Sequence, residues 1–113
     1  MIGTATLASG VARAQDPFQV TFSVIRTGGT EPVRVNGRVL NEGVQDVFDV
    51  YVTAEALNDK GKVLSRGLTH VGQVLRPSAT EPFVAKVPVV PGIASYRVVV
   101  SSFRFGLGAG QSP

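Results

Sequence analysis

The chain has 113 residues, of which 43% are hydrophobic and 17% charged, with a formal net charge of +3 and no cysteine. This length supplies one domain, because it leaves no room for a second hydrophobic core. The missing cysteines exclude a disulfide framework, thiolate metal sites and a cysteine nucleophile. The hydrophobic content excludes a disordered chain, and polar residues interrupt it too often for a membrane-spanning helix.

Residue usage favours an all-β protein. Valine outnumbers leucine and isoleucine together, and 13 glycines and 7 prolines supply many chain reversals. β-branched residues are typical of strands, and frequent turn residues keep those strands short. The basic residues are scattered singly from Arg26 to Arg104. We therefore interpret the positive charge as a solvated surface and expect no nucleic-acid partner.

Residues 1–14 are small and apolar and show no alternation. They end in Ala12-Arg13-Ala14 and are followed by the polar Gln15-Asp16. Small residues three positions and one position before a polar start are typical of a signal-peptidase site. We expect residues 1–14 to be the end of a signal peptide or a disordered leader. The mature protein would then be periplasmic or secreted.

Two alternating segments follow Pro17. The first places apolar residues on one face: Phe18, Val20, Phe22 and Val24. The second alternates Val33, Val35, Gly37 and Val39 with Arg34, Asn36 and Arg38. A period of two predicts half-buried strands. Asn41-Glu42-Gly43 then reverses the chain, since Asn and Gly can adopt positive φ.

A third alternating segment spans residues 48–56. It is predicted to bury Phe48, Val50, Val52, Ala54 and Ala56 and to expose Asp49, Tyr51, Thr53 and Glu55. Because the preceding loop is short, we expect the second and third segments to form an antiparallel hairpin. Asn58-Asp59-Lys60-Gly61 is the strongest turn signal, typical of a type I turn closed by a left-handed glycine.

The rest of the chain is predicted to form further strands. Residues 62–75 mix two parities, so a bulge or a crossing between sheets is expected near Gly67 or Gly72. Residues 83–89 alternate, and Pro88 favours an edge position. Tyr96, Val98 and Val100 form the inner face of the last strand, which can extend through Phe105. The Gly-rich, uncharged residues 106–113 are expected to be a disordered tail.

These segments predict an all-β domain over residues 17–105. Six or seven short strands without a credible helix indicate an immunoglobulin-like antiparallel β-sandwich. A closed barrel is the alternative. Prolines near strand ends are typical of protected sheet edges and favour the sandwich.

The chain from Val33 to Val100 resembles a known family. The resemblance begins with the pattern Val35-x-Gly37-x-Val39-x-Asn41-x-Gly43, which leads into an alternating strand. It continues with Asn58-Asp59-Lys60-Gly61-Lys62-Val63-Leu64, Leu75-Arg76-Pro77, Phe83 and Tyr96-Arg97-Val98. These residues resemble FxLYD-type domains, immunoglobulin-like modules of exported prokaryotic proteins, although the string that names the family does not occur. The resemblance implies an interaction or spacer role outside the cytoplasm, without catalysis.

The chemistry-bearing residues do not indicate an enzyme, a cofactor or a metal site. His70 is the single histidine, and no serine lies in a Gly-x-Ser-x-Gly motif beside it. Asp49 and Glu55 share a strand face but lie about 20 Å apart along the strand, too far for a glycosidase pair. The turn at residues 58–61 lacks the further ligands of a calcium loop. We expect these acidic residues to pair with Arg34 and Arg38 across the hairpin.

One surface is a candidate binding site. On the expected hairpin, Arg34 and Arg38 flank Tyr51, a combination typical of interface centres. We expect a non-catalytic module for protein interaction, assembly or spacing in the cell envelope, with possible peripheral membrane association. The alternative is a module that binds a glycan or another envelope polymer through the Arg34/Arg38/Tyr51 face. The sequence does not indicate the partner's identity or the oligomeric state.

Overall fold

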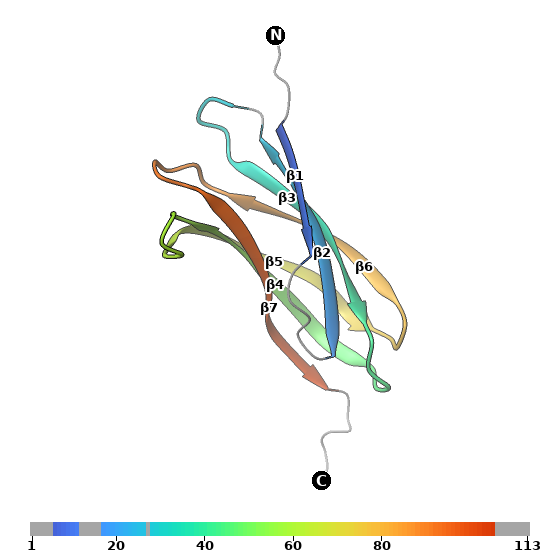
Figure 1. The fold of residues 1–113 in the computed structure, drawn as a ribbon. Helices are drawn as coiled ribbons and strands as arrows, with labels where there is room; N and C mark the ends of the chain where they lie inside the picture. The colour runs from blue at the N-terminus through green and yellow to red at the C-terminus, as the bar shows by residue number, and fades with distance from the viewer. Residues whose placement is uncertain (1–5, 12–16, 27, 106–113) are drawn as a thin grey trace.

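The computed structural model describes residues 6–11, 17–26 and 28–105, and residues 6–11 as backbone only. Its strands are β1 (Thr6–Val11), β2 (Phe18–Arg26), β3 (Val33–Asn41), β4 (Val47–Leu57), β5 (Val63–Leu75), β6 (Thr80–Val87) and β7 (Ser95–Phe105). They form two antiparallel sheets, ordered β1-β2-β3-β6 and β5-β4-β7. The sheets lie in two layers (Figure 1). The predicted β-sandwich is confirmed, and the closed barrel is wrong.

Strands β2 to β7 have an immunoglobulin-like arrangement. In that fold, strands A, B and E share one sheet, while C, C′ and F share the other. Here β2-β3-β6 and β5-β4-β7 take those places in chain order. β6 lies at the edge of its sheet and ends at Val87, directly before Pro88. The edge position predicted from this proline is confirmed, because proline cannot donate to a ladder.

β1 lies within the segment predicted to be a leader. It pairs with β2 over its whole length, from Thr6 opposite Arg26 to Val11 opposite Thr21. The expectation of a disordered leader therefore fails for residues 6–11. Backbone hydrogen bonds can hold a strand whose side chains do not alternate between apolar and polar. The hydrophobic pattern of the sequence therefore could not reveal β1. Cleavage after Ala14 stays a prediction, and residues 1–5, 12–14 and 106–113 lie outside the described residues.

The expected hairpin of β3 and β4 does not form. β3 lies between β2 and β6 in the first sheet, whereas β4 lies in the centre of the second. Both edges of β3 are occupied, so residues 42–46 carry the chain across to the other sheet. Neither Asn41 nor Gly43 has a positive φ. The Asn41 side chain instead organises the crossing, accepting from the Gly43 N–H at 2.8 Å.

The core lies between the sheets and consists mainly of valine. Ten valines of the described residues, among them Val35, Val39 and Val52, are at most 3% exposed, as is Phe18. Gly37 lies opposite Phe83 in the ladder, and the Phe83 ring fills the space that a Gly37 side chain would take. The inward alternation predicted for β2 and β3 places these apolar residues correctly.

A bulge in β4 alters the predicted alternation. Asp49 has a φ of 51°, a left-handed conformation that Asp tolerates better than most residues. The pairing of β4 shifts register beside it, against both β5 and β7. As a result Val47 and Val50 are both buried, whereas Phe48, predicted to be inward, is only half-buried. The bulge predicted for residues 62–75 is confirmed as a register shift in the β4–β5 ladder.

The predicted turn at residues 58–61 is confirmed. The Gly61 N–H donates to the Asn58 carbonyl at 3.0 Å, and Gly61 has a φ of 82°. β5 then runs beside β6 of the other sheet, closing one side of the sandwich (Figure 1). The Ser65 hydroxyl donates across this junction to the Pro88 carbonyl at 2.8 Å. The two sheets therefore meet by backbone as well as side chains at this edge.

Candidate functional site

The structure separates the three residues predicted to share a binding face. Arg34 and Arg38 lie on β3 of the first sheet, and Tyr51 lies on β4 of the second. The outward faces of the two sheets lie on opposite sides of the sandwich. A face that combines all three residues therefore does not exist. The prediction failed because it assumed the hairpin of β3 and β4.

The outer face of the second sheet surrounds Tyr51. Tyr51 lies opposite His70 in the β4–β5 ladder, and their ring centroids are 4.8 Å apart at an interplanar angle of 53°. Leu68 lies opposite Thr53, the next outward position on β4, and is 65% exposed. We call Tyr51, Leu68 and His70 the Tyr51 face. The ring contact explains His70 as a surface residue packed against a tyrosine.

Ion pairs lie at both ends of the Tyr51 face. Arg97 of β7 pairs with Glu55 at 2.6 Å, and its Nε also donates to Glu55 Oε1 at 2.8 Å. Arg104 of β7 pairs with Asp49 at 2.9 Å. The guanidinium of Arg104 also lies 5.5 Å from the Phe48 ring centroid, within range of a cation–π interaction. The predicted pairing of Asp49 and Glu55 with Arg34 and Arg38 is wrong, because the neighbour of β4 on this side is β7.

The outer face of β2, β3 and β6 carries a second group of charges. Arg34 lies directly opposite Lys86 of β6, and Arg38 lies four residues further along β3. Among the described residues, none of the three takes part in an ion pair. We call Arg34, Arg38 and Lys86 the cationic face. Sequence analysis missed Lys86, since an alternating pattern shows which residues share a strand face but not which strands pair.

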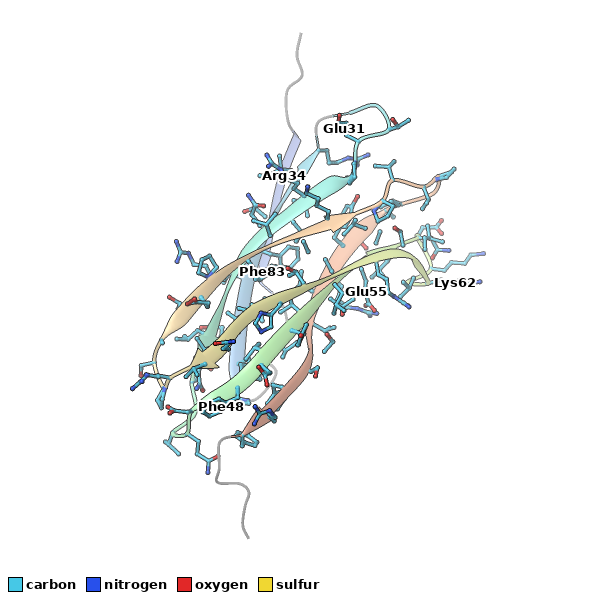
Figure 2. The ribbon with its side chains drawn as sticks, turned by 180° about the vertical axis from the view of Figure 1, so that it is seen from behind. Glu31, Arg34, Phe48, Glu55, Lys62 and Phe83 are labelled. Carbon is cyan, nitrogen blue, oxygen red and sulfur yellow. The ribbon has the colours of Figure 1, made fainter. Side chains whose placement is uncertain are left out.

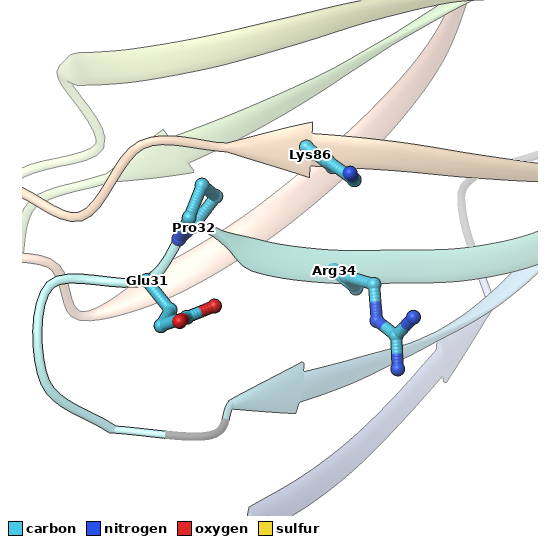
Figure 3. Close-up of a pocket in the computed structure, with 4 residues that line it drawn as sticks. All are labelled: Glu31, Pro32, Arg34 and Lys86. Carbon is cyan, nitrogen blue, oxygen red and sulfur yellow. The ribbon is translucent and has the colours of Figure 1, made fainter.

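A hollow of about 320 Å³ lies at one end of the cationic face. Glu31, Pro32, Arg34 and Lys86 line it (Figure 3). No ion pair joins Glu31 to either cation. The hollow is open to solvent and places two positive groups beside each other.

The described residues hold no group of three histidine, cysteine or acidic side chains placed to bind a metal ion. They also include no helix of the length and hydropathy that a membrane span needs. No known protein family, curated protein or solved structure matches the chain. The resemblance to FxLYD-type domains therefore stays a prediction.

Tyr96 carries a buried hydroxyl group. Its ring packs against the core, and its Oη has no hydrogen-bond partner. Burial raises the pKa of Tyr96 above its ordinary value of 10.0, and the nearby positive charge of Arg26 offsets part of this rise. The fold therefore favours the protonated hydroxyl.

We expect Tyr96→Phe to leave stability at neutral pH unchanged or to raise it by up to about 1 kcal/mol, because the lost hydroxyl makes no hydrogen bond. Since the folded-state pKa of Tyr96 is raised, its contribution to stability is complete below about pH 10 and is lost as pH rises further. The wild type should therefore lose more stability than Tyr96→Phe between about pH 8 and pH 10.5. Urea unfolding of both proteins at the two pH values measures this difference, and equal losses would contradict it.

Proposed function

We propose that this chain is a non-catalytic binding module that docks a partner protein on the Tyr51 face. The observation that carries the proposal is an exposed Leu68 next to the contacting rings of Tyr51 and His70, with arginine–carboxylate pairs at either end. An apolar and aromatic centre inside a charged rim is the composition of protein interfaces. Tyr and Arg are also the residues that most often contribute large binding energies.

The bonds beneath this face hold it in one geometry. The Thr53 hydroxyl, on the central strand, donates to Ser101 Oγ of β7 at 2.9 Å. Each ion pair joins β4 to β7. A face held by several cross-strand bonds loses little conformational freedom when a partner docks, which favours binding.

We further propose that the module works outside the cytoplasm, in the cell envelope. The support for this part is the Ala12-Arg13-Ala14 pattern before Gln15. N-terminal sequencing of the protein recovered from the cells that produce it would test this location. A mature chain that begins at Gln15 supports it, and a chain that keeps residues 1–14 contradicts it.

Photo-crosslinking tests the docking face. A photoreactive phenylalanine analogue replaces Leu68 on the Tyr51 face or, as a control, Val84 on the outer face of the first sheet, which is 49% exposed. We expect one discrete adduct with another protein from position 68 and none from position 84. Adding Tyr51→Ala should weaken capture at position 68 by about tenfold or more, as for the loss of an interface tyrosine.

The controls make the result decisive. Thermal unfolding of each variant must match the wild type, since Leu68 and Val84 are both exposed. Equal adducts from both positions, no adduct from position 68, or an adduct with a second copy alone would contradict the proposal. Undiminished capture by the Tyr51→Ala variant would contradict the role of the aromatic centre.

A further inference from the structure

The cationic face holds its charges without compensation. Arg34 and Lys86 are directly opposite each other on neighbouring antiparallel strands. Like charges at such positions destabilise a sheet. On the other side of the sandwich, Arg97 and Arg104 each pair with a carboxylate. Two cations placed together on a sheet that leaves them unpaired indicate a site for an anionic group.

The other ladder neighbours of these cations are uncharged. Beyond Arg34, the ladder continues to Ile25, and Arg38 lies between Thr21 and Pro82. Between the two arginines, Asn36 lies opposite Val84. Glu31 lines the hollow beside Arg34 and Lys86 but forms an ion pair with neither, so the two cations leave the hollow with a net positive charge. An anion that reaches the face therefore meets a net positive field.

The spacing of the cations favours an extended ligand. Arg34 and Arg38 are four residues apart on one strand, about 13 Å along it. Lys86 lies only about 5 Å to the side of Arg34. One phosphate can contact Arg34 and Lys86 together in the hollow, but it cannot also reach Arg38. A linear chain of anionic groups can contact all three.

The chemistry of the face also excludes other recognition modes. Its described outward positions carry no aromatic ring, whereas proteins that bind single-stranded nucleic acid stack bases on aromatic side chains. Sugar rings are commonly bound by the same stacking. The ligand that fits is held by charge rather than by ring contacts.

We propose that the cationic face binds a linear phosphate-bearing polyanion, with one anionic group in the hollow between Arg34 and Lys86 and a later group at Arg38. This site lies on the opposite side of the sandwich from the Tyr51 face. Binding of the polymer therefore does not depend on the proposed protein partner, and the two can be tested separately.

Titration of the full chain with linear inorganic polyphosphate at several salt concentrations tests the site. Each contact between a cation and a single-stranded polyanion contributes about −0.7 to the slope of log affinity against log salt, so three contacts predict a slope of about −2. Replacing Arg34, Arg38 and Lys86 together by glutamine should weaken binding by about tenfold or more and remove most of the slope. Each single replacement should reduce the slope by about 0.7.

A matched control removes the same net charge elsewhere. Lys60, Lys62 and Arg66 are exposed and lie at or near the β4–β5 turn, away from the cationic face. Replacing these three by glutamine should change polyphosphate affinity by less than about twofold. Equal weakening by both triple variants would overturn the proposal, because it would show attraction to net charge alone.

Three further probes separate the ligand classes. If inorganic phosphate bound as tightly as polyphosphate, the face would be a site for a single anion, and the proposal of a polymeric ligand would be overturned. A single-stranded oligonucleotide of equal charge that binds more tightly than polyphosphate would assign the face to nucleic acid instead. Binding to vesicles of anionic phospholipid without binding to polyphosphate would assign it to a membrane surface.

Discussion

Gly67→Ala should cost the domain about 3 kcal/mol or more of unfolding free energy, at or above the upper end of the usual range for overpacking. Gly67 lies on β5 where this strand runs beside β6 of the other sheet. A Cβ at this position would overlap the backbone carbonyl of Lys86. Both backbones are fixed, because Gly67 is paired with Ala54 and Lys86 with Arg34. Relief of the overlap therefore requires the sheets to separate over the buried core.

Gly72→Ala is the matched control for this prediction. Gly72 lies on the same strand, but a Cβ there would meet only the Glu81 side chain, at an ordinary contact distance of 3.5 Å. We expect this variant to remain within about 1 kcal/mol of the wild type. Urea unfolding monitored by circular dichroism measures all three proteins. Equal losses of stability in the two variants would contradict the prediction, because they would show that the close approach of β5 and β6 at Gly67 is not the cause.

The close packing at Gly67 was not predicted, because the sequence indicated only a bulge or a crossing between sheets near Gly67 or Gly72. The β4–β5 ladder does shift register between His70 and Gly72, whereas Gly67 lies close to the backbone of Lys86. The partner could not be predicted, since it lies on a strand of the other sheet. Alternation along one strand fixes which side chains turn inward, which is why the buried valines of β2 and β3 were identified correctly.

The candidate site depended on information that alternation does not contain. Tyr51 and Arg34 were each placed correctly on the outward face of their own strand. Whether the two strands share a sheet depends on which edges are free, and β3 has none free. The left-handed Asp49 raises the same difficulty, because nothing local distinguishes it from an ordinary outward aspartate. Long-range pairing and local strain were thus the parts that could not be predicted.

Asn41 joins the two sheets through its side chain. It is 0% exposed, and its Nδ2 donates to the carbonyl groups of Gln45 and Leu75, both at 2.9 Å. Its Oδ1 accepts from the Gly43 N–H at 2.8 Å. Gln45 and Gly43 belong to the crossing from β3 to β4, and Leu75 ends β5 of the second sheet. One amide therefore fixes the crossing loop and the far sheet together.

We expect Asn41→Ala to destabilise the domain by about 3 kcal/mol, because it leaves buried backbone groups without partners, each costing about 1–3 kcal/mol. Asn58→Ala is the control, since the Asn58 Oδ1 likewise accepts from two backbone groups, Lys60 N–H and Lys62 N–H, but at an exposed turn. Water can replace those bonds, so the loss there should be about 1 kcal/mol. Urea unfolding of both variants gives the comparison, and equal losses would show that burial of Asn41 is not the cause.

Asn41→Asp separates hydrogen bonding from packing. The shape is kept, and so is the acceptor for Gly43, but the donors to Gln45 and Leu75 are replaced by a carboxylate that repels both carbonyl oxygens. Protonation restores one donor, so the folded state binds this proton more tightly than the unfolded chain does. Stability of this variant, relative to the wild type, should thus fall as pH rises from about 4 to 7. A flat difference over that range would mean that the amide only fills space between the sheets.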